Sequence, residues 1–256
     1  MLEMKSTVIQ RGVFWEDGEL LSNREAASRY FNVVDVTDEE VMSARFAADP
    51  SYLMRGSMTL AQKMGRKFDF ARVDRWLPHF REYAVNRDAI FTDMQHALDF
   101  LLREEDISHM FVRPASPLKE FAGQAFNADS LAKEMNWLKQ GKNIEPRDLL
   151  CVVAPTVQIE REWRCIFVEG RLAGGSQYMT RGEADIRADL PKEVGAFASQ
   201  LARHDYFLNK FEFVIDVGEV AGALRLVEVN GFETASFYAA NLDEIYDRWA
   251  KSLTGC

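Results

Sequence analysis

The chain has 256 residues, 47% of them hydrophobic and 28% charged, which is the composition of an ordinary globular protein with a sizeable core. Its 40 acidic residues outnumber its 31 basic ones, and the net charge of −9 argues against a nucleic-acid coat or a peripheral membrane binder, because both need a net positive face. The apolar stretches are too short to cross a bilayer and no signal peptide is recognised, so we expect a cytoplasmic protein without a membrane partner.

The first 88 residues alternate strands with helices. Helices are expected over Asn23–Tyr30 and Asp38–Ala48, the second introduced by a Thr37/Glu40 capping box. Short runs rich in Val, Ile, Tyr and Leu predict strands at Thr7–Gln10, Asn32–Val36 and Ser51–Met54. This alternation predicts a small, mostly parallel α/β unit.

From residue 89 the pattern changes. Apolar residues at helical spacing from Ile90 to Leu102 predict a helix. The elements expected after it are strands Met110–Arg113 and Lys119–Phe126, a helix over Ser130–Lys139 and a buried strand within Leu149–Ala154. Pro155 then marks a hinge, so residues 89–154 are expected to form a first lobe.

A second lobe is expected over residues 155–256. It would contain a hairpin, Trp163–Val168 and Arg171–Tyr178, turning at Glu169-Gly170. The remaining expected elements are a helix Pro191–Arg203, strands Phe211–Val217 and Leu224–Asn230 joined by a loop carrying Gly218 and Gly222, and a last helix with Leu242, Ile245, Tyr246, Trp249 and Leu253 on one face. The predicted architecture is an α/β N-terminal unit followed by two α+β lobes.

Acidic and amide side chains gather near the C-terminus. Glu228 and Asn230 lie two residues apart on one strand, so they point the same way, and we expect Asp216 to lie opposite Glu228 on the preceding strand. Three hard oxygen donors would then converge as a magnesium site that also uses substrate phosphates as ligands. The alternative is the polar outer face of a hairpin.

Basic side chains form a second cluster. Arg113 closes one expected strand and Lys119 begins the next, so both could meet one anion, Arg with a planar fork and Lys with a point charge. Glu162 and Arg164 share a strand face just after the hinge. Taken singly, each of these residues is equally well explained as a solvated charge or an exposed ion-pair partner. The chain lacks the usual phosphate-loop, dinucleotide, zinc-protease and serine-hydrolase motifs.

Taken in order, these residues and the hinge run Cys151–Val157 resemble the ATP-grasp superfamily. More narrowly, they resemble the clade in which arginine replaces the lysine usual at the first phosphate-binding strand. The resemblance covers roughly residues 88–240 and implies a clamp whose two lobes hold ATP between them. The N-terminal unit is similar to the smaller domain that usually precedes this fold.

The resemblance implies a role for each residue of the nucleotide site. Arg113 and Lys119 would hold the α- and β-phosphates, and Lys119 would also stabilise charge on the transferred phosphoryl group. The backbone around Ala154, Thr156 and Val157 would bond the adenine.

It also implies roles beyond the β-phosphate. Glu162 would accept hydrogen bonds from the ribose, and Arg164 would face the γ-phosphate or an acyl phosphate as a second catalytic cation. Asp216, Glu228 and Asn230 would carry Mg²⁺, with Mn²⁺ as an alternative ion.

The implied function is an ATP- and Mg²⁺-dependent ligase that joins a small-molecule or peptide carboxylate to an amine through an acyl phosphate. The alternatives are a nucleotide-binding regulatory or interaction module without turnover, and a kinase that stops at phosphoryl transfer. Neutral variants of Asp216 or Glu228 should abolish turnover with little loss of folding.

One further feature bears on partners. Residues 55–87 hold eight cations against three acidic residues, a local charge of +5. This run leaves open an anionic substrate such as a tRNA, or it is simply a solvated helix face.

Overall fold

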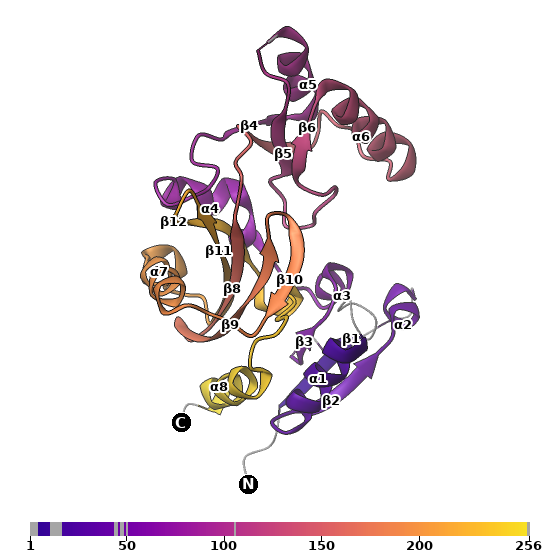
Figure 1. Cartoon of the computed structure of the whole chain (residues 1–256). Helices are drawn as coiled ribbons and strands as arrows, with labels where there is room; N and C mark the ends of the chain where they lie inside the picture. Colours follow the sequence, from indigo (N-terminus) through magenta and orange to yellow (C-terminus); the bar gives the residue numbers. More distant parts are fainter. Residues whose placement is uncertain are drawn as a thin grey trace.

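The computed structural model of the chain describes residues 5–10, 17–43, 46, 49, 51–104 and 106–254. The described strands form three sheets with orders β2-β1-β3, β4-β7-β5-β6 and β10-β9-β8-β11-β12. Figure 1 shows the five-stranded sheet at the centre, the four-stranded sheet with its two helices at one end, and the three-stranded sheet beside the opposite end. Within these ranges we find no helix with both the length and the apolar character needed to cross a bilayer.

The N-terminal sheet is parallel, as the alternation of elements predicts. Its strands are β1 (Ser6–Gln10), β2 (Asn32–Val36) and β3 (Leu53–Arg55), and its helices are α1 (Asp17–Ser28), α2 (Asp38–Met42) and α3 (Met58–Lys63). The capping box is confirmed, because the Glu40 N–H donates to Thr37 Oγ1 (3.2 Å) and the Thr37 N–H donates to Glu40 Oε2 (2.7 Å). The helix expected to reach Ala48 ends at Met42, and most residues from 44 to 48 lie outside the described ranges.

The first lobe is an antiparallel sheet with two helices packed on one face. Its elements are β4 (Ile90–Asp93), α5 (Met94–Arg103), β5 (Met110–Pro114), β6 (Gln124–Phe126), α6 (Ala128–Gly141) and β7 (Leu150–Ala154). Ile90 belongs to the edge strand, not to a helix as expected, because Asp93 accepts a hydrogen bond from the His96 N–H (3.0 Å) and caps the helix there.

The strand expected over Lys119–Phe126 is wrong for its first half. Only Gln124–Phe126 pair with β5, and Lys119 lies in a loop with φ at +51°. That left-handed conformation is incompatible with a regular strand.

The second lobe is built on the five-stranded sheet. Its strands are β8 (Arg161–Val168), β9 (Arg171–Thr180), β10 (Glu183–Arg187), β11 (Glu212–Val220) and β12 (Ala223–Asn230), and its helices are α7 (Lys192–Ala202) and α8 (Leu242–Thr254). The Glu169-Gly170 turn is confirmed, both residues having positive φ. Strand β10 was not expected. It follows a second two-residue turn, Arg181-Gly182, whose φ values are also positive.

Side-chain alternation gives this sheet two different faces. On β8, Trp163, Cys165 and Phe167 pack in one core with α7 and with α4 (Val73–Phe80). Ile166 and Val168 pack on the other face with α8 and the N-terminal unit, and Arg164 precedes them on that same face. Each core therefore continues an apolar layer, while the charged residues occupy one end of the second face.

The two cysteines that lie in described residues are buried free thiols, as expected. Cys151 is in the first-lobe core and Cys165 is in the second-lobe core, and burial raises the pKa of Cys151 to about 12. Cys256 lies outside the described ranges.

A β-bulge sets the register of the last hairpin. The strands run without a long loop to a two-residue turn, Ala221-Gly222, so the loop expected between Gly218 and Leu224 is wrong. Val217 pairs with Leu226 and Asp216 with Glu228, so Val227 is the extra residue. Without it, Val227 rather than Glu228 would face Asp216. The expected pairing of Asp216 with Glu228 is confirmed, for a reason that the sequence did not reveal.

Segments before residue 88 are tied to the second lobe. Helix α4 packs on β12, and the Leu226 N–H donates to the Tyr83 carbonyl (2.8 Å) while the Val85 N–H donates to the Leu226 carbonyl (2.9 Å). Short 3-10 turns complete the described helical elements: η1 (Asp69–Ala71), η2 (Asp205–Phe207) and η3 (Phe232–Thr234).

Much of the basic run 55–87 makes contacts inside the chain. The fully buried Arg55 donates to the Phe232 carbonyl and to the Ala235 carbonyl (2.7 Å), which anchors β3 to η3. The other cations with internal partners are Lys63, Arg66, Arg72 and Arg81. The run therefore holds the chain together more than it presents an anion-binding surface.

Candidate active site

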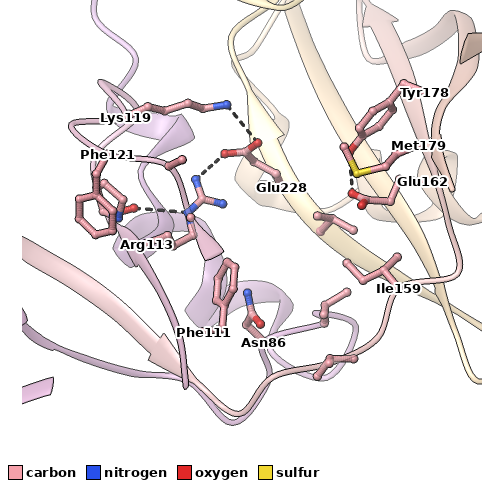
Figure 2. Close-up of a pocket in the computed structure, with 16 residues that line it drawn as sticks. Asn86, Phe111, Arg113, Lys119, Phe121, Ile159, Glu162, Tyr178, Met179 and Glu228 are labelled. Carbon is pink, nitrogen blue, oxygen red and sulfur yellow. Dashed lines mark hydrogen bonds and ion pairs between the residues drawn. The ribbon is translucent and has the colours of Figure 1, made fainter. Parts of the chain in front are cut away.

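A cleft of about 320 Å³ separates the first lobe from the five-stranded sheet. Its walls come from β5 and the following loop on one side, and from β8, β9 and β12 on the other. This volume lies at the lower end of the range for small-molecule sites, about 300–1,000 Å³. Figure 2 shows Arg113 and Lys119 directed at Glu228 on one side of the cleft, and Glu162 with Tyr178 on the other.

Ion pairs to Glu228 cross the cleft. Arg113 Nη2 on β5 donates to Glu228 Oε1 on β12, and Lys119 Nζ lies 3.5 Å from Glu228 Oε2. Lys119 reaches the carboxylate from its loop conformation, not from a strand as expected. Gly123 permits this loop to fold back, since a Cβ there would lie 2.8 Å from the Arg113 Cβ. The structure thus brings both predicted phosphate-binding cations to one predicted metal ligand.

These cations set the ionisation of Glu228. Burial by itself raises the pKa of this carboxyl group, but the charges of Arg113 and Lys119 outweigh burial, and the pKa lies well below its usual range. Glu228 is therefore anionic at neutral pH.

A second ion pair is buried beneath the first. Arg164 donates to both carboxylate oxygens of Asp216, from Nε to Oδ1 (2.9 Å) and from Nη2 to Oδ2 (2.8 Å), and from Nη1 to the Ser236 carbonyl (3.0 Å). The side chain of Asp216 is 1% exposed and that of Arg164 is 8% exposed. Burial opposes the charge of Arg164, but Asp216 outweighs burial and raises the pKa of the guanidinium. Arg164 is therefore a fixed cation.

Asn230 joins the two carboxylates. Its side-chain nitrogen lies 3.0 Å from Asp216 Oδ2 and 3.1 Å from Glu228 Oε2. The three predicted metal ligands thus converge on one spot, as their strand positions predict.

Glu162 lines the opposite side of the cleft. It is almost buried and accepts a hydrogen bond from the Tyr178 hydroxyl (2.7 Å). Burial raises the pKa of Glu162, and the Tyr178 hydrogen bond opposes this only in part. Burial likewise raises the pKa of Tyr178, which keeps that phenol a hydrogen-bond donor.

The hinge residues divide between two surfaces. Val157 lines the cleft, whereas Ala154 and Thr156 line a separate groove beside α5. A contact between adenine and the backbone of Ala154 or Thr156 stays a prediction.

Apolar side chains that the sequence reading did not single out complete the cleft: Phe111, Phe121, Ile159, Met179 and Val227. Phe111 could have been found, because it lies two residues before Arg113 and so shares its strand face. Met179 and Val227 could not, because bulges in β9 and β12 decide which side they face.

The donor set fits Mg²⁺ only together with phosphate. In the part of the chain that the structure describes, no group of three or more Asp, Glu, His or Cys side chains is placed to hold a metal alone. Two carboxylates and an amide do converge, and Mg²⁺ is commonly bound by one or two carboxylates plus substrate phosphates. Three cations and three carboxylates already balance here, so the ion must bring anionic ligands with it.

Comparison with known proteins agrees with this site. A family model described as an ATP-grasp domain, the second family of its clade, matches residues 85–248, which is more than half of the chain and includes every predicted site residue. No curated protein sequence matches the chain. Among ATP-grasp ligases, the cofactors are ATP and Mg²⁺, and solved neighbours include complexes with ATP and with Mg and ADP.

Similar solved structures extend the likeness over the whole chain. D-cycloserine synthetase DcsG is 15% identical with a TM-score of 0.62, and the match covers 98% of both chains. D-alanine–D-alanine ligase from Bacillus anthracis is 13% identical with a TM-score of 0.53, covering 98% of this chain and 95% of that one. The ATP-grasp ligase PsnB, solved with a minimal precursor, is 12% identical with a TM-score of 0.55, covering 98% and 100%. At these identities the likeness establishes the fold.

Proposed function

Because the chain belongs to this family of ATP-grasp domains, we propose that it is a ligase that joins a carboxylate to an amine through an acyl phosphate. The observation that carries the proposal is the convergence of Arg113, Lys119 and Arg164 on Glu228, Asp216 and Asn230 between the lobes. The solved neighbours named as D-alanine–D-alanine ligase and PsnB support ligation as the reaction class.

The proposed reaction has two displacements. A carboxylate oxygen of the acid bonds to the γ-phosphorus of ATP while the bond to the β–γ bridging oxygen breaks and ADP leaves. The amine nitrogen then bonds to the acyl carbon, phosphate leaves with its electron pair, and the nitrogen loses a proton. Neither step needs a nucleophile from the protein, so the chain's contribution is position and charge.

Each cation has a defined share in this scheme. Arg113 offers a planar fork to phosphate oxygens, and Lys119 offers a mobile point charge, its side chain being 56% exposed. Arg164, locked by Asp216, presents a fixed positive charge near the transferred group. Mg²⁺, held by Glu228, Asn230 and Asp216, would neutralise negative charge on the phosphates.

Binding requires an exchange of partners. Glu228 has Arg113 and Lys119 as partners across the cleft, and the proposed function assigns those same cations to phosphate and that same carboxylate to metal. Nucleotide and metal therefore assist each other, since phosphate draws the cations away from Glu228 and so releases the carboxylate for the ion. We expect MgATP to bind much more tightly than either ATP or Mg²⁺ alone.

The function is tested by trapping the acyl phosphate. Hydroxylamine, supplied in place of the amine together with MgATP and a panel of carboxylic acids, should yield hydroxamates detectable by mass spectrometry. A kinase of hydroxyl groups would instead give a stable phosphoester, and a regulatory module would bind MgATP without forming ADP. Either of those outcomes would contradict the proposal.

Arg113→Lys should weaken MgATP binding about tenfold without abolishing it. The charge remains but the fork is lost, and one hydrogen bond to a charged group contributes about 1.5 kcal/mol. Equilibrium dialysis with labelled ATP measures the change. Arg161→Lys, which alters a solvent-exposed pair with Glu219 outside the cleft, is the matched control. Unchanged affinity in Arg113→Lys would mean that Arg113 does not contact phosphate.

A further inference from the structure

A second pocket, of about 220 Å³, lies where the N-terminal unit, the loop after β5 and the second lobe meet. The residues of this pocket that matter here are Phe68, Lys119, Arg164, Asn230, Ser236 and Tyr238. Lys119 lines both this pocket and the nucleotide cleft, so the two spaces meet at that cation. A molecule in the second pocket therefore lies beside the phosphate-binding end of the cleft.

An aromatic pair separates the two pockets elsewhere. The rings of Tyr178 and Tyr238 are stacked, with centroids 5.0 Å apart and planes at 8°. Tyr178 lines the cleft and Tyr238 lines the second pocket. Tyr238 adopts φ of +50°, a conformation that costs free energy for a bulky residue and persists only where its surroundings hold it.

Arg164 makes the second pocket an anion site. Its guanidinium lies 5.3 Å from the Tyr178 ring centroid and 5.0 Å from that of Tyr238. The bonds to Asp216 and to the Ser236 carbonyl use three of its five N–H donors. The remaining donors, with Lys119 and the Asn230 amide, match the needs of a carboxylate.

The N-terminal unit closes the far side. The ring of Phe68 is buried against Gly231, where a Cβ would lie 2.5 Å from the Phe68 ring carbon Cδ1. Met58 and Ala71 of the same unit complete this apolar wall. The volume falls below the about 300–1,000 Å³ of pockets for drug-sized ligands.

We propose that the second pocket binds the acid substrate, that this substrate is a free carboxylic acid of amino-acid size and not a peptide, and that Phe68 sets the size limit. The inference rests on the proposed function and adds the substrate class to it. The carboxylate lies toward Lys119 and Arg164, and a compact apolar part lies against Phe68.

The test compares acids of rising size. Wild-type protein with MgATP and hydroxylamine is given free amino acids from glycine to tryptophan, then di-, tri- and tetrapeptides, and hydroxamates are quantified. Phe68→Ala is expected to raise the rate for the largest acids relative to the smallest by at least about tenfold, the discrimination that a few methylenes give in an apolar pocket. Phe70→Ala, which truncates an aromatic side chain two residues away that does not line the pocket, should leave the size profile unchanged.

Two further readouts separate the possible failures. Ligand-observed NMR should detect binding of the same small acids without nucleotide, and MgATP affinity should be equal in wild type and Phe68→Ala. Tetrapeptides accepted as readily as amino acids, or a size profile unaltered by Phe68→Ala, would overturn the substrate class and leave the ligase proposal standing. MgATP binding without hydroxamate from any acid would overturn the ligase proposal and this inference with it.

Discussion

Glu228→Gln is expected to lower ATP-dependent turnover by about a thousandfold, at the upper end of the effect of removing one electrostatic partner from an active site. The amide keeps the shape of the side chain but loses the charge that holds Mg²⁺ and balances Arg113. Because Glu228 and Arg113 both line the cleft, water can solvate the freed guanidinium, and we expect the variant to remain folded.

Nucleotide binding gives this variant a second, opposite signature. With Glu228 neutral, Arg113 and Lys119 lose their anionic partner, so affinity for ATP in the presence of a chelator should rise while affinity for MgATP falls. Glu219→Gln is the control, since Glu219 is in the adjacent strand and pairs with Arg161 outside the cleft. Full turnover in Glu228→Gln would refute the metal assignment.

Asp216→Asn is expected to impair folding as well as turnover. The sequence predicts little loss of folding, but the structure revises that expectation, because Asp216 is the buried partner of Arg164. Removing one member of a buried ion pair typically costs about 3–5 kcal/mol, since the other charge stays desolvated. Urea unfolding should therefore place Asp216→Asn well below Glu228→Gln in stability.

A double variant separates the structural from the chemical effect. Arg164→Met combined with Asp216→Leu removes both charges and keeps apolar volume, a replacement that is often neutral or stabilising for a buried pair. It should recover at least half of the stability lost in Asp216→Asn, yet turn over no substrate because the fixed cation is gone. Equal stability of Asp216→Asn and wild type would mean that the pair contributes nothing to folding.

Local patterns predicted the elements wherever the physics is local. The Thr37/Glu40 capping box, the Glu169-Gly170 turn and the buried strand ending at Ala154 each depend on residues that are neighbours in the chain. The same patterns failed where a distant partner decides. Lys119 follows an extended-looking run but lies in a loop that reaches Glu228, more than a hundred residues away.

The candidate site divides in the same way. Side-chain chemistry and order along the chain were enough to single out Arg113, Lys119, Glu228 and Asn230. They did not reveal that Arg164 binds Asp216, because that contact depends on the pairing of β8 with β11. Phe68 carried no signal at all, since its place in the second pocket depends on how the N-terminal unit packs against Gly231.

The amino-acid sequence by itself determined which chemical groups this protein carries, their order, and the strands and helices that hold most of them, because hydrophobic periodicity and turn chemistry act over a few residues. Only the tertiary structure decided which groups meet. The bulge at Val227 turns Glu228 toward Asp216, and the loop after β5 brings Lys119 across the cleft. Such meetings depend on register and packing between segments far apart in the chain, where a shift of one residue sends a side chain to the opposite face.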